Sequence, residues 1–205
     1  GFRLGHAHPE FQADQLAAIA DAINATSRSV AVMAPMISTV TEAEEFQSLA
    51  KDAGLTQVGI MIETPAIVPM ISDLAGIVDF LSIGTNDLSQ YLFAADRMHP
   101  AMGFFVDPWQ PGLLRTVKAI TDAAEPVSLP VGVCGESAAD PALAIVLAGL
   151  GVSSVSVAAG AVESVREALQ SVTNDTAEHV ARNTLEATSP GEAKARASEA
   201  LAELA

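Results

Sequence analysis

Five short apolar runs alternate with segments of helical periodicity, and this alternation constrains the fold more than any other feature of the sequence. The runs lie at 30–36, 58–63, 80–84, 131–134 and 155–158. They are continuously apolar, which predicts strands covered on both faces. The intervening amphipathic segments are 9–25, 41–53, 66–75, 87–96, 112–124, 141–150 and 161–171. Strand and helix in alternation predict an α/β fold with a parallel sheet and right-handed crossovers.

Polar residues follow three of the predicted strands, and their positions favour a barrel over an open sheet. They are Glu63, the pair Asn86 and Asp87, and the stretch that begins at Cys134. In a closed parallel barrel the carboxyl ends of the strands meet at one mouth, where active sites are built. We therefore expect a (β/α)8 barrel of the TIM type. A complete barrel has eight strands, so five predict only its C-terminal part, with the others preceding Gly1.

Helix signals support this division and add a different tail. Thr41 with Glu44 predicts a capping box, and Asp140 before Pro141 predicts an N-cap followed by the first helical position. We expect the barrel domain to span 1–173. Residues 174–205 are rich in Ala and Glu without a strand pattern, which predicts a helical segment whose last helix starts near Ser189 or Pro190.

Charge and cysteine content exclude several classes of partner. The chain of 205 residues has 10 basic and 25 acidic side chains, a net charge of −15. Such a surface repels nucleic acid and anionic membrane. The apolar runs are shorter than the roughly 20 residues of a membrane span. The single cysteine, Cys134, excludes an internal disulfide and favours a reducing, cytoplasmic setting. The first residue is Gly1 rather than Met, so we expect a piece of a longer protein.

Two carboxylates at neighbouring strand ends predict a metal site. Glu63 and Asp87 would offer hard oxygen ligands of the kind that Mg²⁺ prefers, with water and substrate completing the octahedron. The alternative is that Asp87 caps the next helix and Glu63 pairs with a surface cation. Gly84 permits a sharp turn and close approach of a ligand, and Asn86 offers an amide donor. The same residue types also suit an ordinary strand-to-helix turn.

Two arginines and the thiol complete the set of candidate residues. Arg97 could bind a carboxylate or phosphate through its planar donors, although helical rise would carry it from the mouth unless the chain turns back. Arg3 has the same two interpretations, anion ligand or surface arginine. Cys134 could be a small buried core residue, or a proton donor or nucleophile at the mouth.

Three motifs together resemble one known family. "GIMIETPA", "DFLSIGTNDLSQYLFAADR" and "VGVCGESAADPALAIVLAGLG" are similar to the phosphoenolpyruvate (PEP)-binding domain of the PEP-utilising enzymes, most of all to enzyme I of the bacterial sugar phosphotransferase system. The resemblance extends from the start of the chain to about Thr173. It implies the site roles that follow, listed by position: Glu63 and Asp87 as Mg²⁺ ligands, Arg3, Asn86 and Arg97 as substrate ligands, and Cys134 as the acid that protonates the enolate carbon.

The resemblance also implies an activity and its partners. A phosphotransferase of this family moves the phosphoryl group of PEP to a histidine in a separate N-terminal domain and releases pyruvate. That histidine then supplies a histidine-containing phosphocarrier protein for sugar uptake, and the enzyme is expected to be a homodimer. None of the four histidines here stands in the family's acceptor motif, and two further phosphate-binding arginines of the family have no counterpart before Arg3. We therefore expect the fragment to be inactive alone.

Three other functions fit parts of the pattern. A Mg²⁺-dependent aldolase or lyase for 2-oxo acids would use the two carboxylates but not Cys134. Pyruvate phosphate dikinase and PEP synthase share the Gly-Thr/Ser-Asn-Asp core. A non-catalytic dimerisation module would need only the helical tail. Pyruvate release from PEP, aldol cleavage and mass in solution distinguish them.

Overall fold

The computed structural model describes residues 2–203 and contains one parallel sheet. Its strands are β1 (Val32–Ala34), β2 (Val58–Ile62), β3 (Phe80–Gly84), β4 (Val131–Cys134) and β5 (Ser154–Ser156). They lie side by side in chain order, β1-β2-β3-β4-β5, and every neighbouring pair is parallel. The α/β class and the parallel sheet are therefore confirmed. A doubly wound sheet would instead reverse its strand order partway across.

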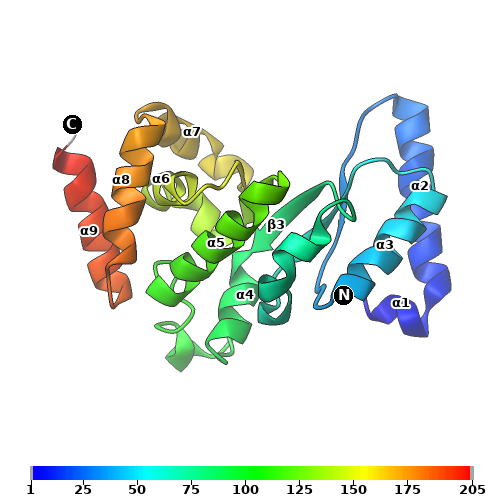
Figure 1. Ribbon diagram of the computed structural model, residues 1–205, viewed down its shortest axis with the longest axis horizontal. Coiled ribbons are helices and arrows are strands. Elements are labelled where there is room, and N and C mark those ends of the chain that lie inside the picture. The colour runs from blue at the N-terminus through cyan, green and yellow to red at the C-terminus, as the bar shows by residue number, and fades with distance from the viewer. Residues whose placement is uncertain (1, 204–205) are drawn as a thin grey trace.

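Helices separate the strands and form the two ends of the molecule. The α-helices are α1 (Leu4–Ala7), α2 (Pro9–Thr26), α3 (Val40–Asp52), α4 (Thr85–Leu92), α5 (Pro111–Ala124), α6 (Pro141–Gly149), α7 (Val162–Gln170), α8 (Asn174–Leu185) and α9 (Pro190–Glu203). Short 3₁₀ segments are η1 (Pro65–Leu74), η2 (Pro100–Met102), η3 (Glu125–Val127), η4 (Glu136–Ala139) and η5 (Ala159–Ala161). Helices α1 to α3 lie at one end and α6 to α9 at the other, with the sheet between them (Figure 1).

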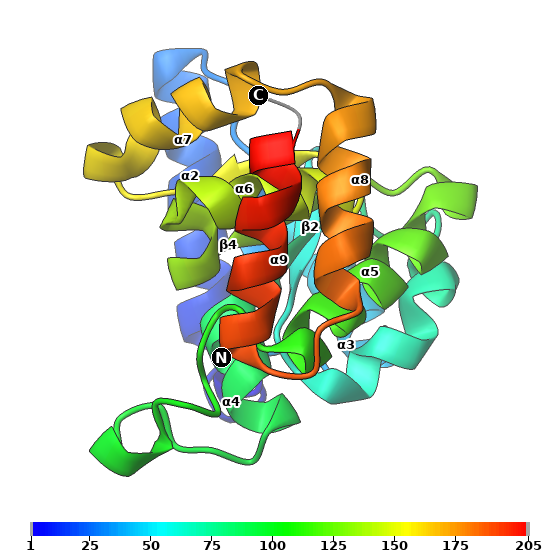
Figure 2. The same ribbon diagram turned by 90° about the vertical axis from the view of Figure 1, so that its left-hand side faces the viewer.

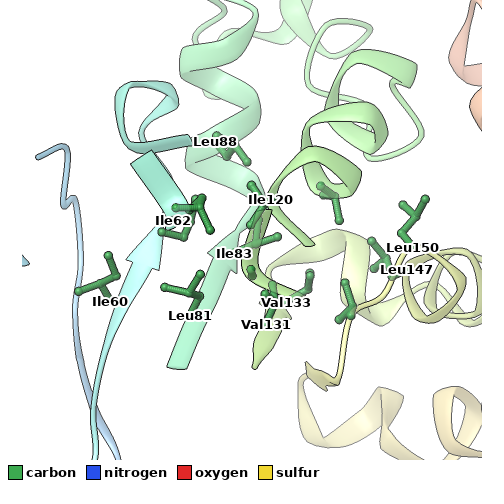
Figure 3. Close-up of a cluster of buried hydrophobic side chains, with 14 of the residues drawn as sticks. Ile60, Ile62, Leu81, Ile83, Leu88, Ile120, Val131, Val133, Leu147 and Leu150 are labelled. Atoms are coloured by element: carbon green, nitrogen blue, oxygen red, sulfur yellow. The ribbon is translucent and has the colours of Figure 1, made fainter. Parts of the chain in front are cut away.

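The core lies between the sheet and its helices. Alternate residues of the three central strands point toward the helical layer, among them Ile60, Ile83 and Val133 (Figure 3). These three side chains are at most 1% exposed. Leu88 on α4 and Ile120 on α5 complete the contact from the helical side. Burial of one such side chain stabilises the fold by roughly 1.5–3 kcal/mol, so this layer fixes the position of the strand ends.

The other face of the sheet is partly open, which corrects the expectation that both faces are covered. Met33 on β1 is 42% exposed, and Ser154 and Ser156 on β5 are also exposed. Met33 and both serines nevertheless line one pocket of about 210 Å³. The sheet is therefore curved enough to bring its first and last strands to a common inner space. The runs lack a polar–apolar alternation because the helix-facing residues alternate with small residues, sulfur-containing residues and Phe80 on the inner face.

Two predicted helix features are wrong in detail. The capping box at the start of α3 uses Thr39 and Glu42, not Thr41 and Glu44, because Thr39 is the last residue with an extended backbone. The predicted helix at 66–75 is the 3₁₀ segment η1, which contains Pro69. A proline inside a helix lacks the N–H needed for the regular α-helical bond.

Other predicted helix ends are confirmed. The Asp140 carboxylate accepts hydrogen bonds from the backbone N–H groups of Ala142 and Leu143 at the start of α6. The final helix begins at Pro190 as expected. Gly1 and residues 204–205, which belong to the predicted segments 1–173 and 174–205, lie outside the described residues. No helix in the part of the chain that the structure describes is both long enough and apolar enough to cross a bilayer.

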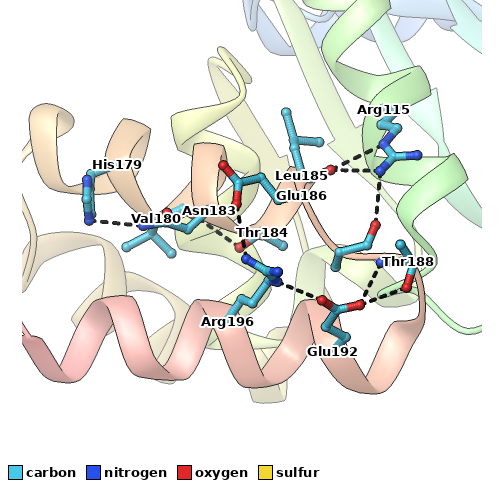
Figure 4. Close-up of polar contacts among 11 residues, drawn as sticks. Arg115, His179, Val180, Asn183, Thr184, Leu185, Glu186, Thr188, Glu192 and Arg196 are labelled. Carbon is cyan, nitrogen blue, oxygen red and sulfur yellow. Dashed lines mark hydrogen bonds and ion pairs between the residues drawn. The ribbon is translucent and has the colours of Figure 1, made fainter.

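The tail is attached to the sheet domain by a polar network that we call the tail anchor, formed by Arg115, Glu186, Thr188, Glu192 and Arg196. Helices α8 and α9 run side by side (Figure 2). Arg115 on α5 donates to the carbonyl oxygens of Leu185 and Ala187, at 2.9 and 3.0 Å from Nη2 (Figure 4). Arg196 pairs with Glu192 and Glu186, so nearly every charged group here has a partner.

Candidate active site

The polar residues predicted from the sequence gather at one edge of the sheet. Glu63 directly follows β2, α4 starts directly after β3, and Cys134 ends β4. In the register of the sheet Ile62 pairs with Ile83, and Gly84 with Cys134. The carboxyl ends of the three central strands therefore lie level with one another, and we call this region the site edge.

Glu63 is a buried acid held by the chain after β1. Glu63 is 3% exposed, and its Oε1 accepts a hydrogen bond from the backbone N–H of Met36 at 2.7 Å. Burial raises the pKa of Glu63 most, and the nearby Asp87 raises it further, against the lowering effects of the Met36 N–H and Arg97. A second positive charge at this position would relieve the cost of ionising both acids.

Gly84 lets the Glu63 carboxylate lie close against the end of β3. A Cβ added at Gly84 would lie 2.7 Å from Glu63 Oε2 and 3.0 Å from the Met61 sulfur. Gly84 also pairs with Cys134 on the other side. The missing side chain therefore lets the Glu63 carboxylate and the Met61 sulfur lie against the Gly84 backbone, at the strand position next to Cys134.

Arg97 returns to the site edge, as its predicted role requires. The chain reverses after α4, where Ala94 has a positive φ of 49°. The Arg97 backbone N–H then donates to Gln90 Oε1 at 3.2 Å. Its Nη2 lies 3.6 Å from Asp87 Oδ1. The guanidinium and the carboxylate of the predicted set are thus neighbours.

Asn86 and Arg97 line a pocket of about 270 Å³ together with Met98, Val106 and Glu136. Asn86 Oδ1 accepts a hydrogen bond from the backbone N–H of Glu136 at 3.0 Å, which turns the amide nitrogen of Asn86 away from that contact. Glu136 lies two residues after β4, in the polar stretch that begins at Cys134, and was not assigned a role of its own from the sequence. The pocket joins the ends of β3 and β4 across α4 and η4.

A pair of buried hydroxyls locks these two strand ends together. Thr85 Oγ1 donates to the carbonyl oxygen of Cys134 at 2.9 Å, and the Ser137 hydroxyl donates to Thr85 Oγ1. Gly135 between them has φ of 99°, and a Cβ there would lie 2.5 Å from Thr85 Oγ1. This left-handed backbone favours glycine, so the turn after Cys134 is set by its own residues.

Cys134 is half-buried at the end of β4 and carries a protonated thiol. Burial raises the pKa of the Cys134 thiol most, and the acids Glu63 and Asp87 raise it further, while a hydrogen bond from Ser82 lowers it. A thiol whose pKa lies above the ordinary value keeps its proton at neutral pH. That is the state required of a proton donor.

Arg3 lies apart from the other predicted residues. Its Nε donates to Glu42 Oε1 at 2.8 Å, and its side chain is 62% exposed. Arg3 is not among the residues that line the pocket of Asn86 and Arg97. It precedes α1, and the neighbouring Phe2 N–H donates to Pro35 O just after β1, so Arg3 lies toward the site edge on the β1 side.

The described residues, 2–203, contain no cluster of three or more His, Cys, Asp or Glu side chains arranged for a metal. A site built on two carboxylates fits the known preference of Mg²⁺, which usually keeps several waters and takes one or two carboxylates plus substrate phosphates. The nearby Asp87 raises the pKa of Glu63, and the donor atoms of both side chains are hard oxygens. The donor set therefore fits Mg²⁺ with substrate bound.

Comparison with solved structures supports the fold alone. A citrate lyase from Burkholderia xenovorans LB400 superposes with a TM-score of 0.53 at 18% identity, covering 73% of this chain and 51% of the lyase chain. RipC from Yersinia pestis gives a TM-score of 0.53 at 12% identity, covering 67% of this chain and 62% of RipC. At such low identity these matches carry no information about substrates.

Comparison with curated proteins and family models shows the family. A phosphoenolpyruvate-protein phosphotransferase of Streptomyces coelicolor is 41% identical over 96% of this chain and 36% of the relative. One of Haloferax volcanii is 39% identical over 89% and 34%, and a multiphosphoryl transfer protein of Rhodobacter capsulatus is 38% identical over 95% and 24%.

The chain thus spans about a quarter to just over a third of the length of these relatives. The model of the PEP-utilising enzyme, PEP-binding domain, matches residues 1–174. The family model and these relatives both show that the chain belongs to the PEP-utilising enzymes, as a member of their PEP-binding domain family.

Proposed function

We propose that this chain is the PEP-binding part of a phosphoenolpyruvate-protein phosphotransferase. The observation that carries the proposal is the arrangement at the site edge: the acids Glu63 and Asp87 and the guanidinium of Arg97 gather at the ends of β2 and β3, next to the protonated thiol that ends β4. PEP is a small dianion or trianion whose phosphoryl end and methylene carbon need these two different environments. The phosphoryl acceptor would be a histidine outside these 205 residues, which in turn supplies a histidine-containing phosphocarrier protein.

The substrate anion would be bound by Arg97 and Asn86. Arg97 offers planar paired donors to a phosphate or carboxylate, and its contact with Asp87 positions it at the pocket. The Asn86 amide oxygen accepts a hydrogen bond from Glu136 N–H, which leaves the amide nitrogen to donate to the ligand. We propose that Arg3 adds a further contact after leaving Glu42, from the β1 side.

Glu63 and Asp87 would hold Mg²⁺, which when bound supplies positive charge to the phosphoryl and enolate oxygens. The protein prepares this position through charge. Burial and the neighbouring Asp87 disfavour ionised Glu63, so a bound cation would stabilise the ionised form of this carboxylate. Arg97 supplies part of that compensation from the protein itself.

Cys134 would complete the reaction by moving one proton. The phosphorus–oxygen bond of PEP breaks as the acceptor histidine nitrogen attacks phosphorus, and the electron pair remains on the enolate oxygen. The enolate then collapses to the carbonyl as its methylene carbon takes the proton from Cys134 Sγ–H, leaving a thiolate and pyruvate. Removing the enolate in this way prevents it from recapturing the phosphoryl group.

The fold proposal is that the sheet is the C-terminal part of a (β/α)8 barrel. The strands follow chain order, the polar residues share one edge, and Met33 and Ser156 line one inner pocket. The remaining strands would lie against β1 and β5 and would bring further phosphate-binding arginines. We propose 1–173 as the barrel domain, 174–205 as a helical accessory segment, and a homodimer in the reducing cytoplasm as the working form.

The test uses the parent protein that contains this chain, with its phosphocarrier and PEP. The wild type should release pyruvate in step with phosphorylation of the carrier, and this should require Mg²⁺. Arg97→Ala should raise the KM for PEP, whereas Arg115→Ala in the tail anchor should not. Aldol cleavage of a 2-oxo acid without PEP turnover would assign a lyase instead. PEP turnover with a non-protein acceptor would assign a dikinase or synthase.

A further inference from the structure

The sulfur of Cys134 is held by two groups that belong to β3. The Ser82 hydroxyl donates to Cys134 Sγ at 3.8 Å, and the thiol donates to the carbonyl oxygen of Ile83 at 3.5 Å. Ser82 is 6% exposed, so its hydroxyl has few competing water partners. The contact comes from two residues that lie 52 positions apart in the chain and meet only through the pairing of β3 with β4.

Ser82 reaches Cys134 because its direct neighbour on β4 has no side chain. Ser82 pairs with Gly132 in the sheet, two residues before Cys134, and glycine leaves the inner face free above β4. Ser154 on β5 leans over the same glycine, since a Cβ at Gly132 would lie 2.8 Å from Ser154 Oγ. Gly132 is therefore paired with a serine on each side, Ser82 on β3 and Ser154 on β5, and of these two Ser82 donates to the sulfur.

The charges around Cys134 oppose the loss of its proton. The charged groups that act on the thiol are Glu63 after β2 and Asp87 on α4, both acidic, and β5 contributes Ser156 opposite Cys134. A donor that stays on the sulfur opposes this effect, because a hydrogen bond to an ionised group is roughly twice as strong as one between neutral groups. Ser82 is the side chain that supplies such a donor.

We propose that Ser82 is a positioning residue for proton transfer: its hydroxyl orients the Cys134 sulfur and stabilises the thiolate that remains after the proton leaves. This rests on the proposed role of Cys134 as the acid. In the resting site the S–H bond points to the Ile83 carbonyl. When substrate lies over Gly84 the S–H turns to the methylene carbon, the S–H bond breaks as the C–H bond forms, and the Ser82 O–H remains directed at sulfur throughout.

The test does not depend on catalysis. Because Cys134 is the only cysteine of the chain, the rate of alkylation by iodoacetamide, measured against pH, gives the apparent pKa of this one thiol. Ser82→Ala should move the profile about one pH unit upward, the size expected for loss of a hydrogen bond to a charged group. Ser154→Ala, a serine-to-alanine change on the same inner face, should leave the profile in place, and so should Ser82→Thr, which keeps the hydroxyl.

Two results would overturn the proposal. One is an Ser82→Ala profile that coincides with the wild type, and the other is an equal shift in Ser154→Ala. Circular dichroism shows whether each variant is folded. If Ser82→Ala does not fold, the Ser82→Thr profile decides, since a shift despite the retained hydroxyl contradicts the role.

Kinetics in the parent protein separate this inference from the proposed function. Ser82→Ala should lower kcat for pyruvate formation about tenfold, as a one-unit change in acidity allows, with KM for PEP unchanged. If Cys134→Ala leaves turnover intact, the proposed function of the thiol fails, but an alkylation shift in Ser82→Ala would still establish the contact with Ser82.

Discussion

The site edge and the tail anchor are both built from charged side chains, but the tail anchor stabilises ionised acids whereas the site edge destabilises them. In the tail anchor the backbone N–H and hydroxyl of Thr188, together with Arg196, lower the pKa of Glu192 to about 2. At the site edge, burial and like charge raise the pKa of Glu63 and of Cys134. Charges at the tail anchor are satisfied by the protein itself. The charges at the site edge remain energetically unfavourable until a ligand binds.

This difference distinguishes a structural cluster from a functional one. Groups whose pKa values are moved by desolvation and neighbouring charge mark functional sites more often than paired surface ions do. Substitutions at the two regions should therefore separate activity from stability.

The largest effect should come from Asp87→Asn in the parent protein. The substitution keeps the size of the side chain and removes the charge that both the metal and Arg97 require, so Mg²⁺-dependent pyruvate release should be abolished. Assays across a Mg²⁺ series would check this. Undiminished turnover at saturating Mg²⁺ would place the metal elsewhere.

Cys134→Ala should follow, slowing pyruvate formation by about two to four orders of magnitude, the usual loss for a general acid. PEP affinity should persist, because a thiol adds little binding energy. Single-turnover measurements of pyruvate together with PEP titration check both statements. Unchanged turnover with a lowered melting temperature would make Cys134 a packing residue.

Arg115→Ala should give the reverse pattern in the tail anchor. The carbonyl oxygens of Leu185 and Ala187 lose their donor, and unfolding should become easier by about 1–3 kcal/mol. Turnover per folded molecule should not change. Lys118→Ala on the same helix α5 is the control, since its pair with Asp122 is a surface ion pair that contributes little. Equal destabilisation by both variants would contradict the anchor.

Glu63→Gln should stabilise the fold slightly while it weakens Mg²⁺-dependent PEP binding. The glutamine oxygen can still accept from Met36 N–H, but the buried charge is gone. Because the pKa of Glu63 is raised in the folded state, its favourable contribution is present below the unfolded value and is lost as pH rises through the folded one. The difference in melting temperature between variant and wild type should therefore widen over that pH range. A constant difference would contradict a raised pKa of Glu63 in the folded state.

The smallest effect concerns the stability of the fold at acidic pH. The pKa of Glu192 falls from 4.5 to about 2 on folding, so its stabilising contribution is present above 4.5 and is lost as pH falls toward 2. Thermal melts between these pH values should show wild type approaching Glu192→Gln at the acidic end. Parallel curves would show that Glu192 is not coupled to folding.

Much of the fold follows from local sequence patterns, and their limits are physical. Continuous apolar runs locate all five strands, but they overestimate β1 because residues flanking 32–34 have no pairing partner. Two overlapping Thr-x-x-Glu patterns start at Thr39 and Thr41, and only the three-dimensional path of the chain selects the first. Such choices depend on contacts that a local pattern does not contain.

The site shows the same limit. The strand ends predict that Glu63, Asp87 and Cys134 share an edge, since parallel strands place their carboxyl ends together. The return of Arg97 depends on a left-handed backbone at Ala94, which an alanine does not signal. The contact of Ser82 with Cys134 depends on strand register, and register cannot be read from either strand alone.

The position of the metal tests the central claim most directly. Crystals of the parent protein grown with PEP and Mn²⁺ in place of Mg²⁺ would reveal the ion by its anomalous scattering. We predict a single strong peak that is bound by the carboxylates of Glu63 and Asp87 and by a phosphate oxygen of PEP, on the side of Gly84 opposite Cys134. A peak that contacts neither carboxylate, with PEP bound away from the ends of β2 to β4, would contradict the account.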